Sequence, residues 1–183
     1  MDALSLLLNR SSQPRLGSPA PSGAALENIM QAALRAPDHA CLTPWRFIVC
    51  QNKGLEKLGS LFEQSAIAND KSQKEIEQSV QLPHRAPMII VAIAKYIEHE
   101  KVPKVEQIAS ASCAVMAMQM AAVAQGFNGM WRSGSYAHCE LVREGLGLAE
   151  DDELVGFLYL GTPLFEPAPK PQRNSDDFFE YWN

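Results

Sequence analysis

The fold is decided by residues 108–126, IASASCAVMAMQMAAVAQG, which contain no charged side chain. As a helix this stretch is roughly 28 Å long, enough to cross a bilayer. Its many alanines, with Ser110 and Gln119 among them, make it too weakly hydrophobic for membrane insertion. A helix of moderate hydropathy that is apolar on most faces belongs in a core or a subunit interface. The sequence therefore predicts a long central helix from about Val105 to Gly126 in a soluble protein.

The segments around this helix predict an α+β fold. Residues 88–97 (MIIVAIAKYI) are too continuously apolar for an edge strand. Helices and strands interleave without strict βα alternation, which favours an α+β sandwich over a doubly wound sheet. Four prolines make the C-terminal tail extended and unsuited to a central strand. The other expected elements are helices at 2–9, 22–36, 55–62 and 140–146, a polar helical stretch to 81, a turn-rich segment at 12–21, strands at 46–51 and 154–160, and a short segment from Met130.

Composition limits the classes of function. The 183 residues, 46% of them apolar, suit one well-buried domain spanning 1–183. Sixteen basic against 21 acidic residues give a net charge of −5, which argues against a nucleic-acid or membrane-surface binder. The N-terminus does not resemble a signal peptide. Four cysteines form neither a CxxC pair nor a metal-ligand spacing, so we expect free thiols in a reducing cytoplasm and no metal site.

The first candidate cluster is Arg10-Ser11-Ser12, with Arg15 close behind. Guanidinium groups offer paired planar donors and serine offers a short hydroxyl, a combination that suits a phosphate. The alternative is a polar turn after a helix.

The second cluster runs from Arg35 through Pro37, Asp38 and His39 and closes with Pro44-Trp45. An arginine in the last turn of a helix is common, because its positive charge interacts favourably with the negative end of the helix dipole. Ser22 and Pro37 are expected to begin and end that helix. A histidine beside an aspartate suggests a catalytic dyad, but no nucleophile motif accompanies it. A cysteine hydrolase using Cys41 is therefore disfavoured.

The third cluster is residues 126–134, GFNGMWRSG. Glycines allow the backbone to approach a flat ligand, and Arg132 with Ser133 can contact its polar edge. The alternative is a helix stop followed by a loop. The glycines follow a helix and lack the third glycine of a dinucleotide-binding fingerprint, so a nicotinamide cofactor is expected to bind only transiently, over another ligand.

These clusters, in this order, resemble the nitroreductase family, and most closely its minimal-length bacterial NAD(P)H nitroreductases. The likeness extends from Asp2 to Pro163. It is carried by Ala36-Pro37-Asp38-His39, Pro44-Trp45, Lys101-Val102-Pro103, Glu106-Gln107, AVMAMQMAAVAQG at 114–126 and Trp131-Arg132-Ser133-Gly134. The chain departs from the family where Ser11 replaces a second arginine, Asp38 and His39 replace serines, and Cys41 and Thr43 replace an asparagine and a glutamine.

The resemblance implies a central mixed or antiparallel sheet flanked by helices, the long helix at a homodimer interface, and an extended C-terminal tail over the partner. FMN would lie in a cleft shared by the two subunits. The residues implied are Arg10, Ser11 and Ser12 for its phosphate and ribityl chain, Arg35 and His39 elsewhere on the cofactor, Trp131, Arg132 and Ser133 from the other subunit, and Ala121, Ala122, Val123, Ala124, Gln125 and Gly126 near the nicotinamide nucleotide.

The implied activity is hydride transfer from NAD(P)H to the flavin, followed by ping-pong reduction of an electron-poor acceptor such as a nitroaromatic or a quinone. The hydride step requires positioning and charge stabilisation, so no catalytic side chain is assigned. Two alternatives remain open. One is flavin fragmentation or reductive dehalogenation, which the same fold hosts but which the absence of a lid insertion disfavours. The other is a non-catalytic flavin-binding or structural dimer.

Overall fold

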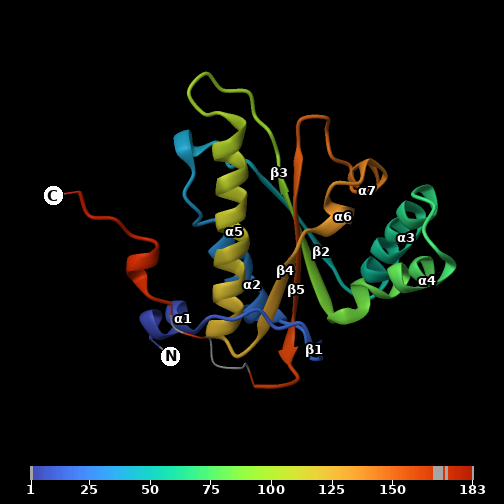
Figure 1. Ribbon diagram of the computed structural model, residues 1–183, viewed down its shortest axis with the longest axis horizontal. Helices are drawn as coiled ribbons and strands as arrows, with labels where there is room; N and C mark the ends of the chain where they lie inside the picture. Colours follow the sequence, from blue (N-terminus) through green and yellow to red (C-terminus); the bar gives the residue numbers. More distant parts are fainter. Residues whose placement is uncertain (1, 167–170, 172, 183) are drawn as a thin grey trace.

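One five-stranded antiparallel sheet forms the centre of the protein (Figure 1). The computed structural model describes residues 2–166, 171 and 173–182. The strand order is β1-β5-β3-β2, with β4 also paired to β5. All four strand pairs are antiparallel, so of the two expected sheet types the antiparallel one is confirmed. The strands are β1 (Leu16–Gly17), β2 (Trp45–Cys50), β3 (Met88–Ala94), β4 (Asn128–Arg132) and β5 (Glu153–Pro163).

Helices cover both faces of the sheet. In Figure 1, α2 and α5 lie on one side, and α3, α4, α6 and α7 lie on the other. The helices are α1 (Ala3–Asn9), α2 (Gly23–Ala33), α3 (Lys53–Ala68), α4 (Gln73–Gln81), α5 (Lys104–Ala124), α6 (Gly134–Ala137) and α7 (Glu140–Gly145), with short 3₁₀ turns at His39–Cys41, Pro83–Arg85 and Ser175–Asp177. This arrangement confirms the α+β prediction.

Strand β3 is buried along its whole length because helices pack on both of its faces. Met88 and Ile90 join a core cluster with residues of α2 and α5. Ile89 and Val91 join a second cluster with residues of α3 and α7. A continuously apolar strand is what such a doubly covered position requires.

Helix α5 packs in the core, as its composition predicts. Among the described residues it is the one helix long and apolar enough to cross a membrane, but nine of its residues are buried within the protein. Gly126, with a φ of 85°, follows its last turn in the left-handed conformation that favours glycine. Met118 and Met120 are buried, whereas Met116 is exposed, so the methionines do lie on several faces.

Several local predictions need correction. Ser22 precedes α2 but makes no capping hydrogen bond, and α2 ends at Ala33, before Arg35. The turn-rich segment 12–21 contains the two-residue strand β1. Pro163 is the last residue of β5, where its missing N–H removes no interior ladder bond. Pro167 and Pro169 lie outside the described residues.

The third cluster was expected, in one of its two interpretations, to be a helix stop followed by a loop, and only the helix stop is confirmed, at Gly126. Residues 128–132 form strand β4, whereas the sequence predicted a loop, because they pair with Phe157–Gly161 of β5. A Cβ atom on Gly129 would lie 2.7 Å from the Tyr159 carbonyl oxygen. Gly129 therefore permits close packing within the sheet, and contact of the third cluster with a flat ligand stays a prediction.

Candidate functional site

The first cluster begins where α1 ends. The Asp2 carboxylate accepts a hydrogen bond from the Ser5 amide at 3.0 Å and caps the helix. Immediately after the helix, the Arg10 guanidinium donates to the Gln119 side-chain oxygen at 3.3 Å and to the Ser12 hydroxyl at 3.5 Å. Arg10 and Ser12 are thus brought together as predicted, beside the C-terminal half of α5.

A single carbonyl group joins this cluster to β4. The Gly129 oxygen accepts hydrogen bonds from the Gln119 amide nitrogen at 2.7 Å and from the Gln13 backbone N–H at 3.0 Å. Gln119 therefore bridges Arg10 and β4 from within α5. Sequence reasoning did not assign it this role, and the only local signal was a glutamine within an uncharged helix.

The second cluster is a tight loop held by Asp38. Its carboxylate accepts hydrogen bonds from the Leu42 and Thr43 amides at 3.2 and 2.7 Å. Ala40, Cys41 and Thr43 adopt positive φ angles of 51–60°, and such strain in residues other than glycine gathers at functional sites. A cavity of about 550 Å³ opens beside the loop, with Arg35, Asp38, Cys41, Thr43 and Trp45 among its lining residues.

This loop rests on the N-terminal half of α5. The His39 Nδ1 atom lies 2.7 Å from a Glu106 carboxylate oxygen. The Trp45 indole donates to the Ser110 hydroxyl at 3.0 Å, and that hydroxyl donates to the Pro37 carbonyl. Asp38 therefore fixes the loop while His39 pairs with Glu106, so the two neighbours do not form a dyad. Sequence reasoning did not assign Glu106 this contact.

The first and second clusters lie at different levels of one helix. Gln119, beside Arg10, and Ser110, beside Pro37, are nine residues apart on α5, about 13 Å along its axis. Within one chain, the two clusters thus contact separate parts of α5.

The third cluster lies at the end of β4. The Trp131 indole donates to the Val155 carbonyl at 3.1 Å. The Arg132 guanidinium carbon lies 5.5 Å from the centroid of the Tyr159 ring, within cation–π range. Burial raises the pKa of Tyr159 to about 12, and the nearby Arg132 charge opposes this shift. Ser133 follows directly and is exposed.

Two buried polar atoms in these clusters have no hydrogen-bond partner within the described part of the chain. They are the hydroxyl of Ser11, a residue only 5% exposed, and the Nε atom of Arg132. Buried donors left without partners are costly and rare in native proteins. An anionic or carbonyl oxygen could accept from either group. Both residues are in the set predicted for FMN, and a phosphate and a polar ring edge fit these donors.

Residues 121–126 take part in packing between helices. The Gln125 amide donates to the Ala25 carbonyl at 3.1 Å, and its oxygen accepts from Asn28 at 2.9 Å. Ala122 is fully buried. Gln125 thus ties the end of α5 to α2, and contact of this segment with a nicotinamide nucleotide stays a prediction.

The fold and these clusters define an α+β protein whose polar donors gather along one core helix and the strand after it. Residues 9–162 match the model of the nitroreductase family. The chain belongs to this family.

Known proteins agree with this assignment. YdjA of Escherichia coli K12, named as a candidate NAD(P)H nitroreductase, is 54% identical over 92% of each chain. The structure of a nitroreductase-like family protein from Bacillus cereus superposes with a TM-score of 0.86 at 20% identity, over 100% of this chain and 96% of that one. The structure of NfnB, an FMN- and NADPH-dependent nitroreductase from a Sphigopyxis strain, gives a TM-score of 0.78 at 17% identity over 100% of both chains.

Proposed function

We propose that this protein is an FMN-dependent oxidoreductase that takes hydride from NAD(P)H and reduces electron-poor acceptors such as nitroaromatics or quinones. The observation that carries the proposal is the pair of unpartnered buried donors, Ser11 Oγ and Arg132 Nε, in a member of the nitroreductase family. The nicotinamide part of the proposal is supported by YdjA, which is named as a candidate NAD(P)H nitroreductase, and the flavin part by NfnB, which is described as FMN-dependent.

The side chains would bind and orient the cofactor rather than transfer protons. When bound, FMN would supply the hydride-transfer chemistry. Arg10, Ser11 and Ser12 would hold its phosphate and ribityl chain, and Arg132 would place a positive charge beside the ring. Fixed positive charge stabilises the negative charge that reduction adds, without rearrangement during the reaction. His39, oriented by Glu106, would contact the same cofactor.

We further propose a cytoplasmic homodimer that builds each FMN site from both subunits. The separation of the first and second clusters along α5, and the partly exposed Trp131, support a site that a second chain completes. The four free cysteines suit a reducing compartment.

The direct test is flavin content and reduction. Purified protein should be yellow, with FMN released on denaturation, and anaerobic NADH or NADPH should bleach it. Protein that stays colourless after FMN is added would contradict the proposal. Flavin that neither nicotinamide reduces would instead support a non-catalytic flavin-binding dimer.

An arginine substitution tests the phosphate site. Arg10→Ala should weaken FMN binding by roughly 1.5–3 kcal/mol, the scale of a charge-assisted hydrogen bond. Lys53→Ala is the control because Lys53 is an exposed cation on α3, which lies across the sheet from α5. Its FMN affinity should equal that of the wild type in a fluorescence titration. Equal affinity in the Arg10 variant would remove Arg10 from the site.

A further inference from the structure

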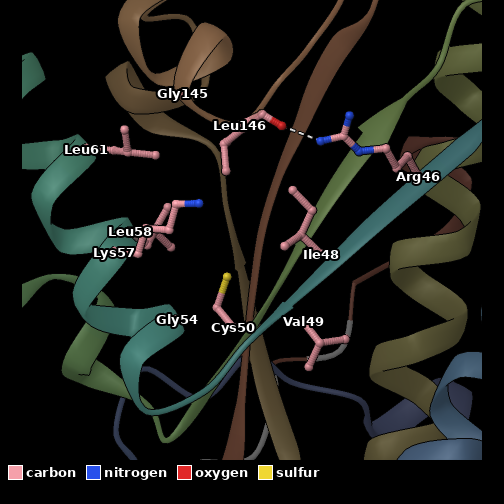
Figure 2. Close-up of a pocket in the computed structure, with 10 residues that line it drawn as sticks. All are labelled: Arg46, Ile48, Val49, Cys50, Gly54, Lys57, Leu58, Leu61, Gly145 and Leu146. Atoms are coloured by element: carbon pink, nitrogen blue, oxygen red, sulfur yellow. Dashed lines mark hydrogen bonds between the residues drawn. The ribbon is translucent and has the colours of Figure 1, made fainter.

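A second cavity, of about 330 Å³, lies across the sheet from the α5 layer, between β2, α3 and the end of α7 (Figure 2). Successive side chains of β2 point to opposite faces of the sheet, so the two faces have different neighbours. Ile48 and Cys50 point toward this cavity, whereas Trp45 and Phe47 pack in the cluster with α2 and α5. Leu58 and Leu61 of α3 form the opposite wall, so the walls are mainly apolar.

The wall at α7 is fixed from two sides. The Arg46 guanidinium donates to the Leu146 carbonyl and, at 2.7 Å, to the Gly147 carbonyl, which satisfies the end of the helix. On the α3 side, a Cβ atom on Gly145 would lie 2.3 Å from a Leu61 methyl carbon, so the two elements are in close contact. The cavity is therefore bounded by elements that are packed against one another.

The charged side chains that line this cavity are all positive. The lining includes two cations, Arg46 and Lys57, and no carboxylate, although the whole protein carries a net charge of −5. Lys57 is exposed and extends its ammonium group over the cavity in Figure 2. The Cys50 thiol points inward and is 6% exposed, and burial raises its pKa, so it presents a neutral sulfur. The thiol therefore adds to the apolar surface and, being protonated, is a weak nucleophile that alkylating agents modify slowly.

We propose that this cavity binds a small apolar monocarboxylate. The hydrocarbon part packs against Ile48, Leu58 and Leu61, and the carboxylate pairs with Lys57 at the rim. The volume is at the low end of the range for ligand sites, which selects a small molecule. Apolar walls with a few placed polar groups are the usual composition of such a site. This inference does not depend on the proposed flavin site, because the residues that line this cavity belong to none of the three clusters.

Calorimetry with sodium octanoate on the purified flavin-loaded protein tests the proposal. Octanoate should bind saturably, and octan-1-ol should bind more weakly because it lacks the charge. Lys57→Met should weaken octanoate binding about fivefold, the upper range for an exposed ion pair. Lys53→Met is the matched control, since Lys53 lies on the same helix but does not line the cavity. Its affinity for octanoate should be unchanged.

Two further measurements locate the ligand. Octanoate should slow alkylation of Cys50 by N-ethylmaleimide, followed by mass spectrometry, and should leave the flavin absorbance unchanged. The proposal is overturned if octanoate does not bind, if both lysine variants bind it equally, or if it displaces FMN. It is also overturned if Cys50 reacts at the same rate with and without octanoate.

Discussion

The Arg132 guanidinium lies over the ring of Tyr159, a buried tyrosine of β5. Tyr159 is 4% exposed, and desolvation raises its pKa to about 12 while the Arg132 charge acts in the opposite direction. Tyr159 is therefore neutral in the folded protein over the ordinary pH range. The Arg132 charge is not cancelled by this neighbour and stays available to an anion.

Tyr159 should make the stability of the fold depend on alkaline pH. Its folded pKa lies above the unfolded value of about 10, so its stabilising contribution is complete below pH 10 and is lost as pH rises through 12. Between pH 10 and 12 the wild type should lose about 2–3 kcal/mol more unfolding free energy than Tyr159→Phe. Urea unfolding at several pH values measures the difference.

The matched control for this residue is Tyr181→Phe, because Tyr181 is 83% exposed. It should follow the wild-type pH dependence. Parallel pH profiles for the wild type and Tyr159→Phe would show that burial does not perturb the Tyr159 phenol.

At the scale of elements, an irregularity in β5 positions Trp131. The register of β5 against β3 shifts after the pair Ala92 and Gly156, and Gly156 has a φ of 142°. A Cβ atom at Gly156 would lie 2.6 Å from the Trp131 indole nitrogen. The glycine lets the indole cross the strand and donate to the Val155 carbonyl. Bulges commonly direct side chains in this way beside functional sites.

Two glycine substitutions should therefore have opposite effects. Gly156→Ala should destabilise the protein by about 1–3 kcal/mol, because it combines a disfavoured φ with a clash against backbone and indole. Gly54→Ala should stabilise it by about 0.5–1 kcal/mol, because Gly54 is helical and a Cβ atom there makes an ordinary 3.5 Å contact with Cys50.

Thermal unfolding followed by tryptophan fluorescence measures both changes. If Gly156→Ala is as stable as the wild type and keeps its emission maximum, then Gly156 does not position Trp131.

The elements that sequence predicted best are those with a strong local pattern. The apolar run in β3 and the uncharged α5 specify their own burial, so both were placed correctly. Strand β4 was missed because residues 126–129 (GFNG), which lead into it, have the composition of a loop. Its strand conformation depends on pairing with β5, which lies about thirty residues further along the chain. Local sequence contains no information about a partner that far away.

In the candidate site, too, the sequence predicted the local groups of donors but not the contacts between distant parts of the chain. The clusters around Arg10 and Arg132 were recognisable as groups of donors, and two of their atoms are the buried ones without partners. The contact of Arg10 with Gln119 spans 109 positions, and that of His39 with Glu106 spans 67. Such contacts arise only from the packing of α5 against the N-terminal segments. Ligand contacts of the predicted residues remain predictions.

At the scale of the whole molecule, the exposed face of α5 is a candidate surface for association of two subunits. Exposed Val105, Ala109, Cys113 and Met116 recur at helical spacing and form an uncharged stripe. The inner face of the same helix is already packed in the core. An uncharged exposed stripe on a long helix is typical of an association surface.

Met116→Glu should prevent formation of a homodimer. Met116 is 48% exposed and lies on this stripe, whereas Met118 is 1% exposed and belongs to the core, so a glutamate at 116 tests association rather than folding. The variant should sediment as a monomer or aggregate. Ile67→Glu, at the exposed end of α3, is the matched control and should remain dimeric. A wild-type protein that sediments as a stable, FMN-loaded monomer at micromolar concentration would contradict the dimer.

The order in which the electron donor and acceptor bind should follow from their use of one shared region. The glycines after α5 lead into β4 rather than a dinucleotide-binding turn, and the cavity beside the second cluster is bordered by both Arg35 and Trp45. We expect donor and acceptor to occupy this region in turn, so double-reciprocal plots at several acceptor concentrations should be parallel. Menadione and a simple nitroaromatic should both serve as acceptors, because both molecules are flat and electron-poor. Intersecting lines for either acceptor would mean that donor and acceptor bind together, and would require a second site.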